Sequence, residues 1–143
     1  ENIKYSMPDA TDSDVIKAAK AAHIHHYIKT LSKGYDAKIN EESTNISAGQ
    51  KQLLTIARVI LADPKILILD EATSALDNIS QHHVLSSVYS MPCTVLMVAH
   101  RLSTVKGCDR IIVLKDGQIV EQGDYNSLIE KNGEFARLVR KQQ

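Results

Sequence analysis

The first third of the chain combines residues that cap helices with apolar residues at near-helical spacing. Thr11-Asp12-Ser13-Asp14 offers N-terminal caps, and Lys33-Gly34 is typical of a helix end. The apolar positions between them follow at near-helical spacing: Val15, Ile16, Ala19, Ala22, Tyr27, Ile28 and Leu31. This pattern predicts one amphipathic helix over residues 13–32. The polar residues 34–46 are expected to be irregular.

A second helix is predicted from residue 47 onward. Ser47 and Gln50 fit a capping box, in which each side chain bonds to the other residue's backbone N–H. The run LLTIARVILA over residues 53–62 is apolar almost all round, which indicates a buried helix. Asp63-Pro64 ends it, because proline cannot continue a helix.

The rest of the chain alternates short aliphatic runs with helical segments. Residues 66–69 read ILIL without polar alternation, which predicts a strand buried on both faces, as in a parallel sheet. The further elements are expected in this order: a helix over residues 80–89, strands over 94–99 and 110–114, a turn at 115–118 with a return strand over 119–122, and helices over 125–131 and 134–141. Strands and helices in alternation predict an α/β fold of the doubly wound type.

Composition excludes several classes of function. The 143 residues are 43% hydrophobic and carry 17 basic and 17 acidic side chains, a balance typical of a globular domain. Zero net charge argues against nucleic acid as a partner. No apolar run approaches the roughly 20 residues of a membrane-spanning helix. Cys93 and Cys108 lack the spacing of metal ligands and are interpreted as reduced thiols of a cytosolic protein.

Two of the predicted strands end in polar residues. Asp70 and Glu71 follow the first strand and His100 follows the second, so all three are expected at the sheet edge where α/β proteins bind ligands. A carboxylate after a purely aliphatic strand is costly unless it meets a cation or hydrogen bonds, so Asp70 is the candidate ligand of a nucleotide-bound Mg²⁺. Glu71 is the candidate base for an attacking water, and His100 is the candidate hydrogen-bond donor to a γ-phosphate.

Each of these candidates also has a structural interpretation. An acid at a strand end can cap the next helix, and a single histidine there can be purely structural. The segment 47–50 leaves the same choice open, because a helix start containing Gly49 can bind phosphate or can be a plain capping box. The paired histidines are interpreted as surface residues, since neighbours on a helix point about 100° apart; they are His25, His26, His82 and His83.

Five motifs in a fixed order resemble the ATP-binding-cassette (ABC) nucleotide-binding domain of membrane transporters, most closely the exporter type. They are residues 34–41 for the exporter segment, 46–50 for the signature motif, 66–71 for the Walker B strand with its catalytic glutamate, 74–77 for the D-loop, and His100 for the switch histidine. The resemblance implies a partial P-loop NTPase-like parallel sheet flanked by helices. It also implies that residues 1–52 belong to the helical signature subdomain and residues 53–143 to the ATPase core.

The same resemblance implies cofactors and partners. ATP and Mg²⁺ would bind between two such domains, in a homodimer or a heterodimer. Asp70, Glu71 and His100 would serve the subunit's own nucleotide. The residues implied to contact the partner or its nucleotide are Ser47, Ala48, Gly49, Gln50 and Asp77. Glu41 would face the coupling helices of a transmembrane domain, at the cytoplasmic face of the membrane.

One departure from the family pattern is large. No glycine precedes a lysine and no two glycines lie five apart, so the phosphate loop G-x-x-x-x-G-K-[ST] is absent. We expect the chain to be the C-terminal part of a longer polypeptide. Because the phosphate loop is absent, the isolated chain is expected not to hydrolyse ATP. Among smaller departures, Ala48 replaces the signature's first glycine.

Two alternatives to an exporter ATPase stay open at this point. The first is a soluble ABC ATPase of DNA repair or translation; against it, about 20 residues separate the signature from the Walker B strand, which leaves no room for a coiled coil. The second is a non-catalytic dimerisation or docking fragment.

Overall fold

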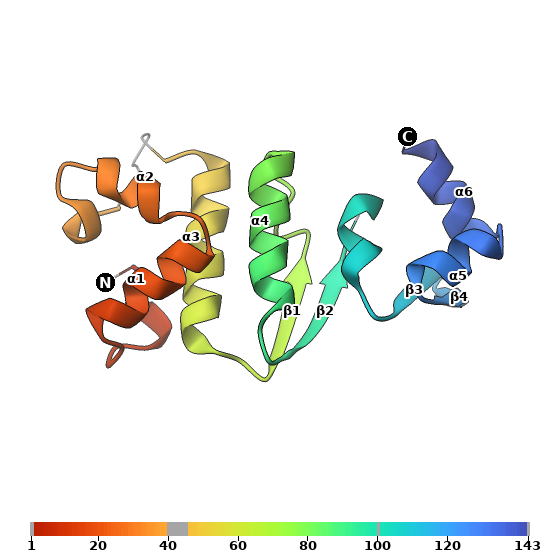
Figure 1. Cartoon of the computed structure of the whole chain (residues 1–143), viewed down its shortest axis with the longest axis horizontal. Coiled ribbons are helices and arrows are strands. Elements are labelled where there is room, and N and C mark those ends of the chain that lie inside the picture. Colours follow the sequence, from red (N-terminus) through yellow and green to blue (C-terminus); the bar gives the residue numbers. More distant parts are fainter. Residues whose placement is uncertain (1, 40–45, 100, 143) are drawn as a thin grey trace. The chain divides into compact units, whose positions relative to one another are not determined.

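The computed structural model describes residues 2–39, 46–99 and 101–142 (Figure 1). Two compact units make up the chain, Glu1–Met97 and Val98–Gln143. The subdomain boundary expected after residue 52 falls inside a continuous helix, α3 (Ala48–Ala62), and it stays a prediction. Among the described residues, no helix is both long enough and apolar enough to cross a bilayer.

Two helices replace the single helix predicted over residues 13–32. α1 (Asp12–Ala21) begins at a capping box between Thr11 and Asp14, and α2 (His25–Thr30) follows after a break. The break is at His23, whose φ of 58° is left-handed and cannot continue a right-handed helix. The prediction of one helix is therefore wrong. The turn brings Ile24 into the core, where its side chain is fully buried.

Helix α3 has the predicted start and end, but the expectation of a helix buried almost all round is wrong, because only Leu53, Leu54, Ile56 and Ala57 are buried in it. The Ser47 hydroxyl accepts from the Gln50 N–H and the Gln50 side chain accepts from the Ser47 N–H, which completes the predicted capping box. The helix ends at Ala62, and its C-cap, Asp63, has a left-handed φ of 43°. Its buried face, centred on Leu54 and Ala57, packs in the core of the first unit, and the helix contacts α1 and the short 3₁₀ helix η1 (Lys4–Ser6).

Strands β1 (Ile66–Asp70) and β2 (Thr94–Val98) pair in a two-stranded sheet, and their arrows point the same way in Figure 1. Helix α4 (Asn78–Tyr89) is the crossover between them. The prediction that β1 is buried on both faces is wrong. Leu67 and Leu69 are buried, whereas Ile66 and Ile68 are 67% and 64% exposed. The described residues of the first unit cover only one face of this strand, so side chains that point to the other face are exposed.

The second unit is built on a hairpin. β3 (Ile111–Lys115) pairs antiparallel with β4 (Gln118–Gly123), and Asp116 and Gly117 at the turn both have positive φ, as a two-residue hairpin loop requires. A 3₁₀ helix, η3 (Leu102–Gly107), precedes β3. Among the described residues the strands form two two-stranded sheets, β1–β2 and β3–β4.

Two short helices, α5 (Tyr125–Glu130) and α6 (Glu134–Lys141), pack on this hairpin. Phe135 and Leu128 fill the core between the elements. The buried Glu121 of β4 accepts a hydrogen bond from the Phe135 N–H at 2.8 Å and so caps α6, whose own cap residue, Gly133, has no side chain. The expected α/β class, with helices flanking small sheets, is confirmed.

Candidate nucleotide site and its supporting contacts

Two exposed carboxylates, those of Asp70 and Glu71, lie at the end of strand β1. Its side chains alternate, with Leu67 and Leu69 in the core, so Asp70 points to the same open face as Ile66 and Ile68. Glu71 follows with a φ of 47°. A left-handed conformation is uncommon for a residue with a side chain, and such residues cluster at functional sites. The chain therefore leaves the strand abruptly at the predicted catalytic glutamate.

Asp77 ends the loop that Glu71 begins, and it has a structural role. Its carboxylate accepts from the N–H groups of Ile79 and Ser80, at 3.0 and 2.9 Å, and from the Ser80 hydroxyl at 2.7 Å. These bonds, that of the Ser80 N–H above all, hold the pKa of Asp77 below its usual value. The helix-capping interpretation that the sequence allowed for Asp70 is thus found at Asp77, the cap of α4.

The predicted signature residues form the first turn of α3. Ser47 and Gln50 bond to each other, at 2.9 and 3.2 Å. Ala48 and Gly49 lie between them, and the N–H groups of a first turn have no acceptor within their own helix. The N–H groups and the positive end of the helix dipole make this start suited to an anion.

The signature turn and the loop after β1 are in direct contact. A Cβ placed on Gly49 would lie 3.0 Å from the Ala75 carbonyl oxygen and 3.5 Å from the Leu76 side chain, so a larger residue would fit only if the loop moved by a few tenths of an ångström. Gln52, one turn further along α3, hydrogen-bonds to Ser74 and to Ala75. The structure thus brings residues 47–50 and residues 74–77 together within one chain. The role of Gln52 was not predicted, because nothing in the sequence distinguishes it from any polar residue on a helix.

Two of the predicted site residues, His100 and Glu41, lie outside the described residues. The structure therefore does not test the contact of His100 with Asp70 and Glu71, nor the docking role of Glu41. The roles of the other site residues also stay predictions, although their places in the fold are defined.

The paired histidines occupy several environments. His82 and His83 are exposed on α4, and the His83 ring stacks on that of His23 with centroids 4.7 Å apart. His25 is half-buried, and its Nδ1 lies 2.7 Å from the Tyr35 hydroxyl. Among the described side chains, no group of three or more metal-ligating residues could hold a metal ion.

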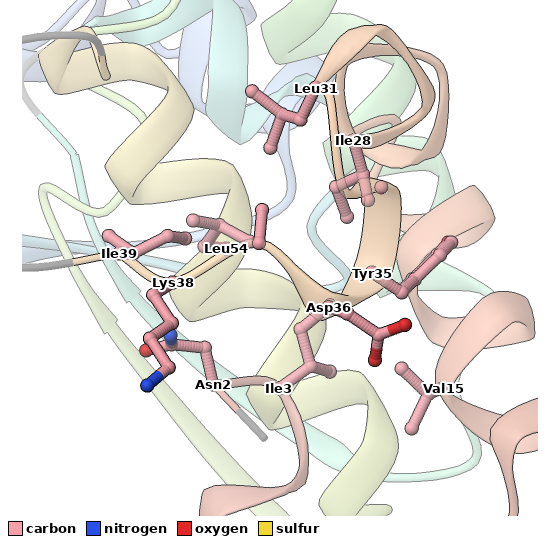
Figure 2. A pocket seen from close by; sticks show the side chains of 12 residues that line it. Asn2, Ile3, Val15, Ile28, Leu31, Tyr35, Asp36, Lys38, Ile39 and Leu54 are labelled. Carbon is pink, nitrogen blue, oxygen red and sulfur yellow. The ribbon is translucent and has the colours of Figure 1, made fainter.

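A pocket of about 480 Å³ lies in the first unit, between the helices and the segment that follows α2 (Figure 2). Apolar side chains that include Ile3, Val15 and Leu54 line it, and Asp36 and Lys38 add one charge of each sign. η2 (Gly34–Asp36) forms part of the wall. This pocket was not predicted from the sequence, although it includes part of the expected exporter segment, residues 34–41.

Comparison with known proteins decides the family. The profile of the ABC transporter family matches residues 2–74, which is about half of the chain. The chain belongs to the ABC transporter family. It is 48% identical over its full length to ABC transporter B family member 19 of Arabidopsis thaliana, and 43% identical, over 96% of its length, to ATP-dependent lipid A-core flippase 1 of Colwellia psychrerythraea.

A solved structure shows the same relationship to ABC exporters. The structure of a bacterial Atm1-family ABC exporter with ATP bound superimposes with a TM-score of 0.90, at 38% identity over 99% of this chain. The ABC chain described here spans 25% of that protein, and 12% and 23% of the two relatives above. The predicted ABC family, its exporter-type relatives and the fold class are therefore confirmed.

Proposed function

We propose that this chain carries the hydrolytic edge of an ABC exporter's ATPase domain. The main support for the proposal is the left-handed backbone of Glu71, where the chain turns away from β1. Asp70 and Glu71 are exposed there, and the loop they begin is packed against the signature turn of α3. The two acids at the end of β1 thus lie on the same framework as the N-terminus of α3. Nucleotide hydrolysis needs both kinds of group, carboxylates for the metal and the water and N–H groups for phosphate.

The residues would divide the chemistry among them. Asp70 offers exposed carboxylate oxygens, the donor type that Mg²⁺ prefers, and the ion would neutralise phosphate charge. Glu71 would accept a proton from the attacking water at its carboxylate. His100, outside the described residues, would donate a hydrogen bond to the γ-phosphate. No phosphate loop occurs in the 143 residues, so the main grip on the phosphates would come from other parts of the protein.

The signature turn would act on a second nucleotide. Ser47, Ala48, Gly49 and Gln50 would contact ATP held by a partner nucleotide-binding domain, and the D-loop around Asp77 would lie at the dimer contact. Support comes from the exposure of Ser47 and Ala48 at a helix N-terminus. Nucleotide-driven closure of this dimer would power transport.

The pocket of the first unit supports a membrane-domain partner. Its apolar wall and its two charged residues, Asp36 and Lys38, suit a short helical segment with an apolar face. The exporter segment near Glu41 adjoins it in the sequence. We infer that coupling helices of a transmembrane domain dock here, and the chain would then lie at the cytoplasmic face of the membrane.

Phosphate release by the full-length transporter tests the catalytic proposal. Glu71→Gln removes the base and should lower the hydrolysis rate by about a hundredfold or more, while Mg-ATP still binds. Glu130→Gln makes the same change at an exposed position of α5 and serves as the matched control with an unchanged rate. Wild-type turnover in the Glu71 variant would remove Glu71 from the catalytic role.

The missing phosphate loop favours a second function for the 143 residues on their own, that of a non-catalytic docking or dimerisation fragment. Titration of Mg-ATP into the purified chain should then show no micromolar binding, because most of the phosphate-binding groups are absent. Micromolar affinity would contradict this.

A further inference from the structure

The loop from Glu71 to Asp77 is held from two sides. From α4, the buried Gln81 donates its side-chain N–H to the Thr73 hydroxyl at 2.8 Å. From α3, Gln52 bonds to the two residues that follow Thr73. The middle of the loop is therefore fixed between two helices, while its ends carry the predicted catalytic and D-loop acids.

Gln52 makes both of its loop contacts with one amide group. Its Nε2 donates to the Ser74 hydroxyl at 3.3 Å, and its Oε1 accepts from the Ala75 N–H at 3.1 Å. Because the amide is planar, the two bonds together fix the position and the orientation of the loop relative to α3. A movement of α3 by a few tenths of an ångström would either carry the loop with it or break these bonds.

The same face of α3 presents the signature turn. Gly49 precedes Gln52 by three residues, so both lie on one side of the helix. The backbone of Gly49 abuts the Ala75 carbonyl, and Gln52 bonds to the Ala75 N–H, so one peptide segment of the loop is gripped by both residues. The start of α3 and the loop that begins at Glu71 therefore form one mechanical unit.

We propose that Gln52 is a positioning residue that couples the signature turn to the loop carrying Glu71. The inference rests on the proposed function, in which α3 faces the partner's nucleotide and Glu71 serves the subunit's own. A nucleotide that orders the signature turn would then also place Glu71, and by linkage the placement of Glu71 would favour that nucleotide. The physical carriers of the coupling are the two hydrogen bonds of Gln52 and the close approach of Gly49.

A purely structural role for Gln52 makes different predictions. Gln52→Met keeps the side-chain volume and removes both bonds. Gln52→Glu keeps an acceptor for the Ala75 N–H, and the Ser74 hydroxyl can rotate to donate to it, so the bridge survives. Thr55→Ala is the matched control, since Thr55 is exposed one turn later and its hydroxyl donates to the Lys51 carbonyl within α3. If Gln52 couples the signature turn to the loop carrying Glu71, Gln52→Met slows ATP hydrolysis and Gln52→Glu keeps most of the wild-type rate.

The test measures kcat for ATP hydrolysis, Kd for Mg-ATP and Tm in the full-length transporter. Gln52→Met should lower kcat by about tenfold with Kd within about twofold of wild type, because the loss concerns placement of Glu71 and not nucleotide affinity. Gln52→Glu should keep kcat within about threefold of wild type, and Thr55→Ala should have the wild-type kcat. Ser74→Ala removes one bond of the bridge and should lower kcat in the same direction; it replaces Gln52→Met where that variant does not fold.

Three results would overturn the inference. The first is a wild-type kcat in Gln52→Met or its replacement Ser74→Ala, and the second is a Glu variant as slow as the Met variant. The third is a Kd for Mg-ATP that rises well beyond about twofold together with the fall in kcat, because nucleotide binding would then be disturbed as well. Failure of the proposed function has a separate signature, which is wild-type hydrolysis in Glu71→Gln. If Glu71→Gln is inactive and Gln52→Met is fully active, only the coupling by Gln52 is refuted.

Discussion

Replacing Gly49 by alanine perturbs the contact between the signature turn and the loop with a single methyl group. The added Cβ would lie 3.0 Å from the Ala75 carbonyl oxygen, and ordinary contacts of this kind begin near 3.4 Å. The loop must therefore move away from α3 by about 0.4 Å. The Leu76 side chain, at 3.5 Å from the same Cβ, already lies at ordinary contact and does not add to the shift.

The cost of this displacement follows from the bonds it stretches. The bond from the Ala75 N–H to Gln52 would lengthen from 3.1 Å to about 3.5 Å, the limit for such a bond. Losing one neutral hydrogen bond costs about 0.5–1.5 kcal/mol, whereas alanine in place of glycine within a helix gains about 0.5–1 kcal/mol. The two effects nearly cancel, so the free energy of unfolding should change by less than about 1 kcal/mol.

The effect on the rate of ATP hydrolysis is not offset in this way. Because Glu71 begins the displaced loop, ATP hydrolysis by the full-length transporter should fall by about tenfold or more in Gly49→Ala. Thermal unfolding measured on the same preparations separates the two effects. A variant with wild-type turnover would refute the claim that loop position controls the site. A loss of stability above about 2 kcal/mol would show instead that the added methyl disrupts the core.

Three further outcomes test other parts of the account. Ala48→Gly, at an exposed position of the signature turn, should leave stability within about 1 kcal/mol and should alter the hydrolysis rate, so an equal rate would dismiss a role for this substitution. His23 is exposed, but partial desolvation of its ring, and then the charge of His83, lower its pKa from the ordinary 6.5. The folded chain therefore binds fewer protons than the unfolded chain and loses stability as pH falls from above 6.5 through the lowered pKa. His23→Asn, which tolerates the left-handed φ, should show a smaller fall in Tm between pH 7.5 and pH 5. Glu121→Leu should lower the free energy of unfolding by about 1–3 kcal/mol, because it leaves the Phe135 N–H without its acceptor. Glu121→Gln keeps that acceptor and should lower the free energy of unfolding by less than about 1 kcal/mol. Equal losses of the two variants in urea titrations would contradict this capping role.

The sequence predicted those parts of the fold that depend on near neighbours. The capping box of Ser47 and Gln50 spans three residues, so the start of α3 could be read directly. The turn at Asp116 and Gly117 is local as well. The break at His23 was missed, although the apolar pattern steps by five residues there, from Ala22 to Tyr27. The core position of Ile24, which the break creates, has no signal in that pattern.

Tertiary context also decided the burial of β1. An aliphatic run without alternation indicates cover on both faces, yet the described residues cover only the face of Leu67 and Leu69. The site was predictable where it follows the chain, as Asp70 and Glu71 follow β1. The bridge from Gln52 was not, because its partners lie 22 and 23 residues away and no local pattern encodes that contact.

The most direct test of the central claim is a single-turnover measurement on the full-length transporter carrying Glu71→Gln. Mg-ATP is bound, free nucleotide is removed, and the retained ATP and the released phosphate are followed together. The variant is expected to hold intact ATP in a closed dimer, whereas the wild type releases phosphate. Phosphate release by the variant at the wild-type rate would contradict the assignment of the hydrolytic edge to the end of β1.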